Sequence, residues 1–228
     1  MGIPSFREVV RANRQQLIQL TDSALWSCAY TASALSQKPN EPDFIASLVF
    51  HGTKQLANSW KNIFLSYNIS VSIIGIYCHK SPKIHFYNMI SGSIEIGDLL
   101  WCHFHTDRED KTSRWAILFQ AKIKTNVKNC VTDQLILYKR WPRFSYVTPK
   151  TLKNQNRRVQ PSSLRKGAVY LIIDPSFLQA KSYRRKLFEV AKAQYPIHNH
   201  IDLCDYLIDS IIYPSGCLFL DWPKVKRK

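Results

Sequence analysis

The sequence EIGDLLWCHFHTDREDKTSRWAILFQAKIK, at residues 95–124, decides the fold of this chain. It contains two apolar runs separated by a polar, charged loop, a pattern that is typical of two β-strands. We therefore predict one strand at 94–104 and a second at 115–123. The short connection between them favours hairpin-like pairing.

Three polar side chains interrupt these apolar strands. Asp98 lies near the turn end of the first strand, and Gln120 and Lys122 lie two residues apart, on one face of the second. Burying Asp98 or Lys122 alone would be costly, so we expect each to meet a partner, a metal ion or water. In a chain this basic, a carboxylate, an amide and an ammonium on adjacent strands suggest metal-assisted cleavage of a phosphodiester.

The expected metal is Mg²⁺ or Mn²⁺, because hard cations prefer oxygen ligands. The Asp98 carboxylate and the Gln120 amide oxygen can supply such ligands, together with a backbone carbonyl. We expect Lys122 to orient the metal-bound water or to stabilise charge in the transition state. Gln120 has no charge, so a further acid is needed, and the candidates are Glu95 and Glu41.

The charge of the chain predicts a polyanionic partner. Lysine and arginine total 32 against 16 acids, giving a net charge of +16 and a pI of about 9.7. DNA is the expected partner, and RNA stays open. The segment 139–186 holds thirteen Lys or Arg residues and a single acid, Asp174. The predicted nucleic-acid contacts are Gln134, Tyr138, Arg140, Arg143, Arg157, Arg158, Arg165 and Lys166.

Periodicity along the rest of the chain predicts a single α/β domain over 1–228, with a mixed β-sheet flanked by helices and helical additions at both ends. A long helix should begin at Asn40, which can cap it, and end near Ser66. A loop is expected at 148–166. The other expected helices are 5–20, 24–35, 132–141, 183–193 and 202–212, and the other expected strands are 69–77, 84–87, 168–173 and 216–220.

Cysteine usage and hydropathy bear on the compartment. The six cysteines are dispersed without a CxxC pair, which favours free thiols in a reducing environment. No apolar run is long enough for a membrane span, and the first residues lack the apolar core of a signal peptide. We therefore expect a cytoplasmic protein without membrane segments. His103 and His105 share a strand face, and Cys78-His79 precedes a turn. These residues lack any zinc-site spacing, so solvated or core positions are favoured for the three histidines.

Gly97-Asp98 followed by Gln120-Ala121-Lys122 resembles the signature of the PD-(D/E)XK nuclease superfamily, in the Gln-x-Lys variant of Mrr-like restriction endonucleases. The predicted α-β-β-β-α-β order is also similar to the core of that family. By this likeness Asp98, Gln120 and Lys122 match the catalytic signature, and Glu41 matches the acid often supplied by the first helix.

The resemblance implies a restriction-endonuclease-like core and a metal-dependent DNA endonuclease, in restriction or phage defence, acting as a homodimer or as a subunit of a defence complex. Gly97 replaces the usual proline, and Gln120 replaces the usual acid. These departures keep a second hypothesis open, that of a catalytically inactive nucleic-acid-binding module with the same fold. A basic structural or ribonucleoprotein component is a third hypothesis, which rests on charge alone.

Overall fold

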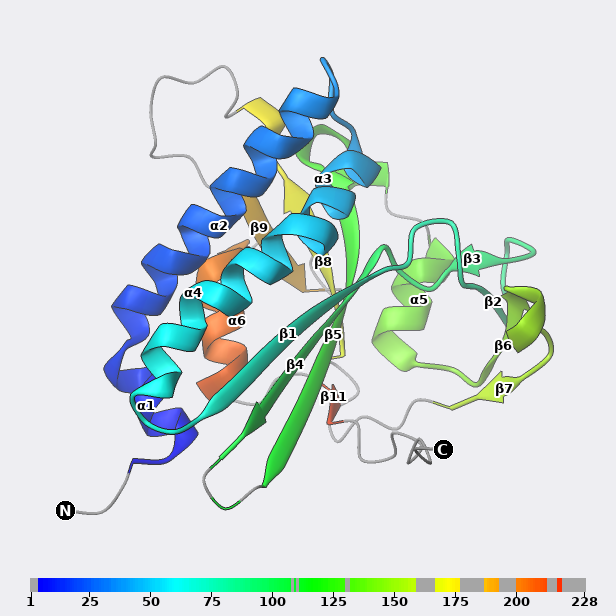
Figure 1. Ribbon diagram of the computed structural model, residues 1–228. Coiled ribbons are helices and arrows are strands. Elements are labelled where there is room, and N and C mark those ends of the chain that lie inside the picture. The colour runs from blue at the N-terminus through cyan, green and yellow to red at the C-terminus, as the bar shows by residue number, and fades with distance from the viewer. Residues whose placement is uncertain are drawn as a thin grey trace.

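A mixed β-sheet lies at the centre of the computed structural model, which describes residues 4–107, 109, 111–129, 132–158, 167–176, 187–192, 200–212 and 217–218 (Figure 1). Its strand order is β1-β4-β5-β8-β9-β10, and β11 pairs with β5 beside this path. The strands are β1 (Ser70–Tyr77), β4 (Leu99–Thr106), β5 (Thr112–Ile123), β8 (Ala168–Ile173), β9 (Phe188–Lys192), β10 (Ile201–Asp202) and β11 (Cys217–Leu218).

One step along this path is parallel, and the other steps are antiparallel. Strands β1, β4 and β5 form an antiparallel meander, whereas β5 and β8 run parallel. Parallel neighbours need a crossover, and helix α5 (Thr132–Arg140) lies between β5 and β8 in the chain. The prediction of an α/β fold with a mixed sheet flanked by helices is confirmed.

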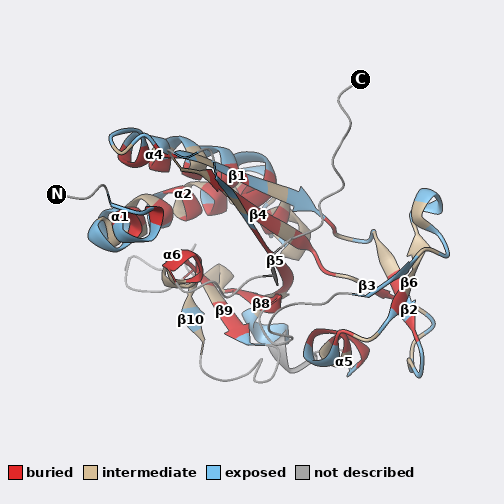
Figure 2. Ribbon diagram, turned by 90° about the horizontal axis from the view of Figure 1, so that it is seen from below, coloured by how far each residue is buried: buried red, intermediate tan, exposed pale blue. Residues whose placement is uncertain are grey.

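Helices cover the sheet on both faces. On one face lie α1 (Phe6–Ala12), α2 (Arg14–Leu35), α3 (Glu41–Ser47), the π-helical turn Leu48–Gly52, α4 (Thr53–Leu65) and α6 (Leu203–Ile212). Helix α5 lies on the other face (Figure 2). The predicted helix from Asn40 to Ser66 is present as α3, the π turn and α4. Its start is a capping box, in which Asn40 and Asp43 each accept the other's backbone N–H.

A second, smaller sheet packs beside α5. It has the order β3-β2-β6-β7 and consists of β2 (Lys83–Phe86), β3 (Ile94–Glu95), β6 (Phe144–Thr148) and β7 (Asn156–Arg157). Ile84 and Phe144 from this sheet share a core with Tyr138 of α5 and with Tyr170 and Ile172 of β8. The large sheet therefore separates two apolar cores, one on each face.

Four predictions about elements are wrong. The helices expected at 5–20 and 24–35 are instead α1 and α2, which divide at Asn13. The expected strand 94–104 is divided into β3 and β4, which belong to different sheets. Residues 144–157 contain β6 and β7, although a loop was expected from 148 onward. Instead of a helix at 183–193, residues 188–192 form strand β9, which pairs with β8 and places alternate side chains in the two cores.

Gly97 marks the place where the chain passes from the small sheet to the large one. A β-carbon there would lie 2.8 Å from the side chain of Leu118 and 3.1 Å from the carbonyl oxygen of Phe119. Only glycine lets the chain lie this close to β5, and Asp98 follows directly.

None of the described helices combines the length and the apolar character needed to cross a bilayer.

Candidate active site

Asp98 lies just before β4 and faces the end of β5. Its backbone N–H donates to the carbonyl of Phe119 at 2.8 Å. Its carboxylate oxygen Oδ2 accepts hydrogen bonds from the backbone N–H of Ala121 at 2.8 Å and from the side-chain amide of Gln120. The predicted meeting of Asp98 and Gln120 is therefore present in the structure.

Two more ligand-type side chains converge on Asp98. His79 follows β1, the neighbour of β4, and its Nδ1 lies 3.0 Å from Asp98 Oδ1. The same nitrogen lies 3.7 Å from Glu95 Oε2. One ligand atom from each of His79, Glu95 and Asp98 falls within 4.8 Å of the other two. Among the described residues, no other such group of three ligand-type side chains occurs.

The electrostatics of Asp98 favour an added cation. Burial raises the pKa of Asp98, and the neighbouring Glu95 raises it further. His79, the Ala121 N–H and Lys122 lower the same pKa, but they do not cancel the effect of burial. Two carboxylates and an imidazole at this spacing provide oxygen and nitrogen donors, so these residues fit a divalent metal ion.

Lys122 is held from the helix layer by Glu41. Glu41 lies in the first turn of α3, where its Oε2 is 3.6 Å from Lys122 Nζ. Its other oxygen accepts the backbone N–H of Ile123 at 2.9 Å. The structure thus places Glu41, predicted as an additional acid, beside the lysine of the signature.

Gln120 is oriented by two buried residues of α5. Its amide nitrogen donates to Asp98, and its Oε1 accepts a hydrogen bond from the side-chain amide of Gln134. Tyr138 donates to the Ile96 carbonyl at 2.8 Å and lies 3.5 Å from Gln120 Oε1. Gln134 is 6% exposed and Tyr138 is 1% exposed. These two predicted nucleic-acid contacts therefore offer almost no surface here, and they position Gln120.

The remaining predicted nucleic-acid contacts lie at the surface or outside the described residues. Arg140 and Arg143 are exposed at the end of α5, and Arg157 and Arg158 are exposed at and after β7. The sequence predictions omitted Lys80 and Lys83, which follow His79 on the way into the small sheet. Arg165 and Lys166 lie outside the described residues.

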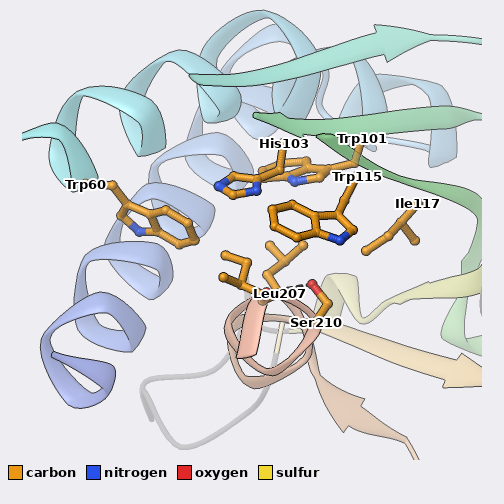
Figure 3. Close-up of a pocket in the computed structure, with 8 residues that line it drawn as sticks. Trp60, Trp101, His103, Trp115, Ile117, Leu207 and Ser210 are labelled. Carbon is orange, nitrogen blue, oxygen red and sulfur yellow. Dashed lines mark hydrogen bonds between the residues drawn. The ribbon is translucent and has the colours of Figure 1, made fainter. Parts of the chain in front are cut away.

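An internal cavity lies between the sheet and helices α4 and α6, and it is separate from this site (Figure 3). His103 and Trp115 line it, and their ring nitrogens have no hydrogen-bond partner among the described residues. The cavity measures about 10 Å³, which suffices for about one water molecule. Phe6 and Trp115 stack on His105, so both histidines are core residues rather than metal ligands.

Comparisons of the chain with protein-family models, with curated protein sequences and with solved structures give no match. The comparisons therefore give no support for a function, and the conclusion about the chemistry of the site depends on its geometry. The sequence favoured a solvated or core position for His79, whereas the structure places it with Glu95 and Asp98. The one available signal was its place directly after a strand, because β1 pairs with the strand that begins at Leu99.

Proposed function

We propose that this protein is a metal-dependent nuclease that hydrolyses phosphodiester bonds in DNA. The observation that carries the proposal is the hydrogen bond between Gln120 and Asp98 at one end of two adjacent strands, β4 and β5, with Lys122 near enough to lower the pKa of Asp98. Apolar packing does not require a carboxylate, an amide and an ammonium there. Their cost of burial is easiest to explain by a chemical role.

The chain topology supports a restriction-endonuclease-like core. Helix α3, strands β1, β4 and β5, helix α5 and strand β8 follow one another in the α-β-β-β-α-β order, with β5 and β8 parallel. The small sheet and its strands β2, β3, β6 and β7 are then insertions into this core. The setting in restriction or phage defence rests on the family resemblance alone.

The residues divide the chemistry between them. Asp98 and Glu95 would hold the divalent ion with their carboxylates, and Gln120 would join them only by turning its oxygen toward the ion. A bound divalent ion lowers the pKa of its water and neutralises charge on the phosphate. Lys122, held by Glu41, would stabilise the negative charge that develops on the phosphate during cleavage.

A basic surface beside the site supports a polyanionic substrate. Residues 80–96 and 139–158 build the small sheet and the end of α5, and Glu95 is the sole acid in these two segments. Their Lys and Arg residues are Lys80, Lys83, Lys139, Arg140, Arg143, Lys150, Lys153, Arg157 and Arg158. Because Lys83 pairs with Glu95 across β2 and β3, this surface adjoins the metal-ligand cluster. A phosphate backbone lying on it would pass close to Asp98.

The direct experiment is relaxation of supercoiled plasmid by purified protein with Mg²⁺ or Mn²⁺, with and without chelator. We expect nicking that needs the metal and stops with chelator. Plasmid that stays supercoiled under every metal condition, while a gel shift shows binding, would refute hydrolysis.

That outcome would support the second candidate, a nucleic-acid-binding module without catalysis. The observation in its favour is Gln120, which brings no charge to the site and turns its amide nitrogen, rather than its oxygen, toward Asp98. The neutral amide leaves the ion less well neutralised than the acid that the family signature has at this position.

A further inference from the structure

We infer that His79 is a ligand of the metal ion, and that His79, Glu95 and Asp98 form a site for a divalent first-row transition metal such as Mn²⁺. This inference rests on the proposed function for the role of the ion, but the site itself can be tested by binding alone. It assigns to His79 the ligand position that Gln120 leaves unfilled.

The distances fit a coordination sphere. Two ligands at right angles on an ion with bonds of about 2.1 Å lie about 3.0 Å apart. His79 Nδ1 and Asp98 Oδ1 are separated by 3.0 Å, and Glu95 Oε2 is 3.7 Å from the same nitrogen. A hydrogen bond between His79 and Asp98 would not by itself explain why the Glu95 carboxylate lies close to the same nitrogen. Glu95 approaches the same nitrogen from β3, in the other sheet.

The backbone holds His79 in this place. The N–H of Cys78 donates to the carbonyl of Asp98 at 2.8 Å, which fixes the end of β1 beside the start of β4. Lys80 then adopts a φ of 66°, and this turn leads the chain away toward β2. His79 therefore stands on a defined turn rather than on a free loop.

The cluster is open to an ion on one side. The side chains of His79 and Glu95 are 20% and 26% exposed, whereas that of Asp98 is 3% exposed. Gln120 and the Ala121 N–H occupy Asp98 Oδ2, so Oδ1 is the oxygen that faces His79. An ion entering from solvent would bind between Oδ1, Nδ1 and the Glu95 carboxylate, with water in the remaining positions.

The donor set selects the metal class. Oxygen donors alone suit Mg²⁺, whereas an imidazole nitrogen shifts preference toward transition metals. Two carboxylates with one imidazole suit Mn²⁺, which accepts both donor types and keeps bound water. We therefore expect Mn²⁺ to bind about tenfold more tightly than Mg²⁺.

The test measures Mn²⁺ bound to the full chain by titration calorimetry and by pulsed electron paramagnetic resonance, which detects a nitrogen ligand through its nuclear coupling. We expect one ¹⁴N coupling in the wild type. His79→Ala should abolish it, lower the Mn²⁺ affinity at least about tenfold, and change the Mg²⁺ affinity much less. His85→Ala is the matched control, because His85 is exposed on β2 and bonds to the Gly92 carbonyl instead.

If His79→Ala melts at a lower temperature than the wild type, a second variant, His79→Gln, replaces it in the test, because glutamine keeps a polar side chain beside Asp98. It too should lose the nitrogen coupling. Mn²⁺ that binds and supports cleavage without any ¹⁴N coupling would overturn the inference and leave the nuclease proposal standing. Nitrogen coupling from His79 in a protein that never cleaves would support the site and reject the nuclease. A wild type that binds neither Mn²⁺ nor Mg²⁺ would refute both.

Discussion

Replacing Asp98 with asparagine should stabilise the metal-free protein and abolish its response to metal. The carboxylates of Asp98 and Glu95 offer oxygens within 4.8 Å of each other, and two charges at that distance repel by roughly 3 kcal/mol at an effective dielectric constant of 20. Solvent at the half-buried Glu95, together with Lys122, reduces this repulsion to about 1–2 kcal/mol. The introduced asparagine would still accept the amide of Gln120 and the N–H of Ala121 with its oxygen.

The expected change is a rise in melting temperature of about 2–8 °C in chelator, because a chain of this size gains about 2–4 °C for each kcal/mol. The pKa of Asp98 is raised in the folded protein, so the ionised carboxylate costs stability at neutral pH. The folded state binds this proton more tightly, so the cost fades as the pH falls toward the ordinary value of 3.8. The advantage of Asp98→Asn should shrink in parallel.

Asp133→Asn is the matched control, because the Asp133 carboxylate is also buried but is stabilised by its hydrogen bonds and is not raised in pKa by a neighbouring acid. Its carboxylate accepts from the hydroxyl and N–H of Ser91 and from the N–H of Ile90, and these bonds lower its pKa. Removing the charge should therefore destabilise by about 1 kcal/mol and leave the metal response intact. The assay is differential scanning fluorimetry with chelator, Mg²⁺ or Mn²⁺. An Asp98→Asn protein that melts lower than wild type in chelator, yet still gains stability from metal, would refute this reasoning.

Three further predictions concern other parts of the molecule. Gln120→Glu should lower the melting temperature in chelator, because it adds a carboxylate against Asp98, and should increase the stabilisation by Mn²⁺; equal melting shifts in variant and wild type would contradict this. Replacing Arg157 and Arg158 with serine should weaken binding to any duplex and flatten the slope of log affinity against log salt by about 0.9 for each phosphate that is no longer neutralised, as measured by fluorescence anisotropy; an unchanged slope would remove β7 from the interface. Burial lowers the pKa of His103 to about 3 and that of His105 to about 4. The free energy of unfolding should therefore fall as the pH drops below 6.5, by up to about 1.4 kcal/mol per pH unit for each histidine. Urea titrations of His103→Phe should show a smaller dependence of this free energy on pH.

Local sequence patterns predicted the elements that are determined by residues close together in the chain. The apolar run of β8 and the capped helix that begins at Asn40 were predicted within one or two residues of their observed bounds. Both depend on residues close in sequence: a buried run of six apolar residues in β8, and the Asn40–Asp43 capping box in α3. Such signals are available in a single sequence.

Elements that depend on distant partners were missed. Residues 188–192 became a strand because β8 offers a free edge for pairing, and no local pattern reveals that edge. The division at Gly97 likewise depends on Leu118 and Phe119, far along the chain, against which the backbone packs. Gly97 was noted only as a departure from a motif, whereas its role is steric.

The candidate site was predicted in part for the same reason. Asp98 and Gln120 could be placed together because they lie on strands joined by a short loop. Side chains alternate along a single strand, which would place Glu95 on the opposite face from Asp98, but the chain turns between β3 and β4, so the two carboxylates meet. His79 enters the site through the pairing of β1 with β4, which only the sheet topology shows.

The most direct test of the central proposal separates cleavage from binding at Lys122. Lys122→Ala removes the ammonium beside the proposed site, and Lys124→Ala is the matched control, because Lys124 lies two residues away and forms its ion pairs with Asp174 and Glu189 instead. Single-turnover cleavage of a labelled duplex with Mn²⁺ should fall at least about a hundredfold in Lys122→Ala while the duplex affinity changes less than about twofold, and Lys124→Ala should cleave like the wild type. Equal cleavage by all three proteins, or equal loss of binding and cleavage in Lys122→Ala, would contradict a catalytic site at this end of β5.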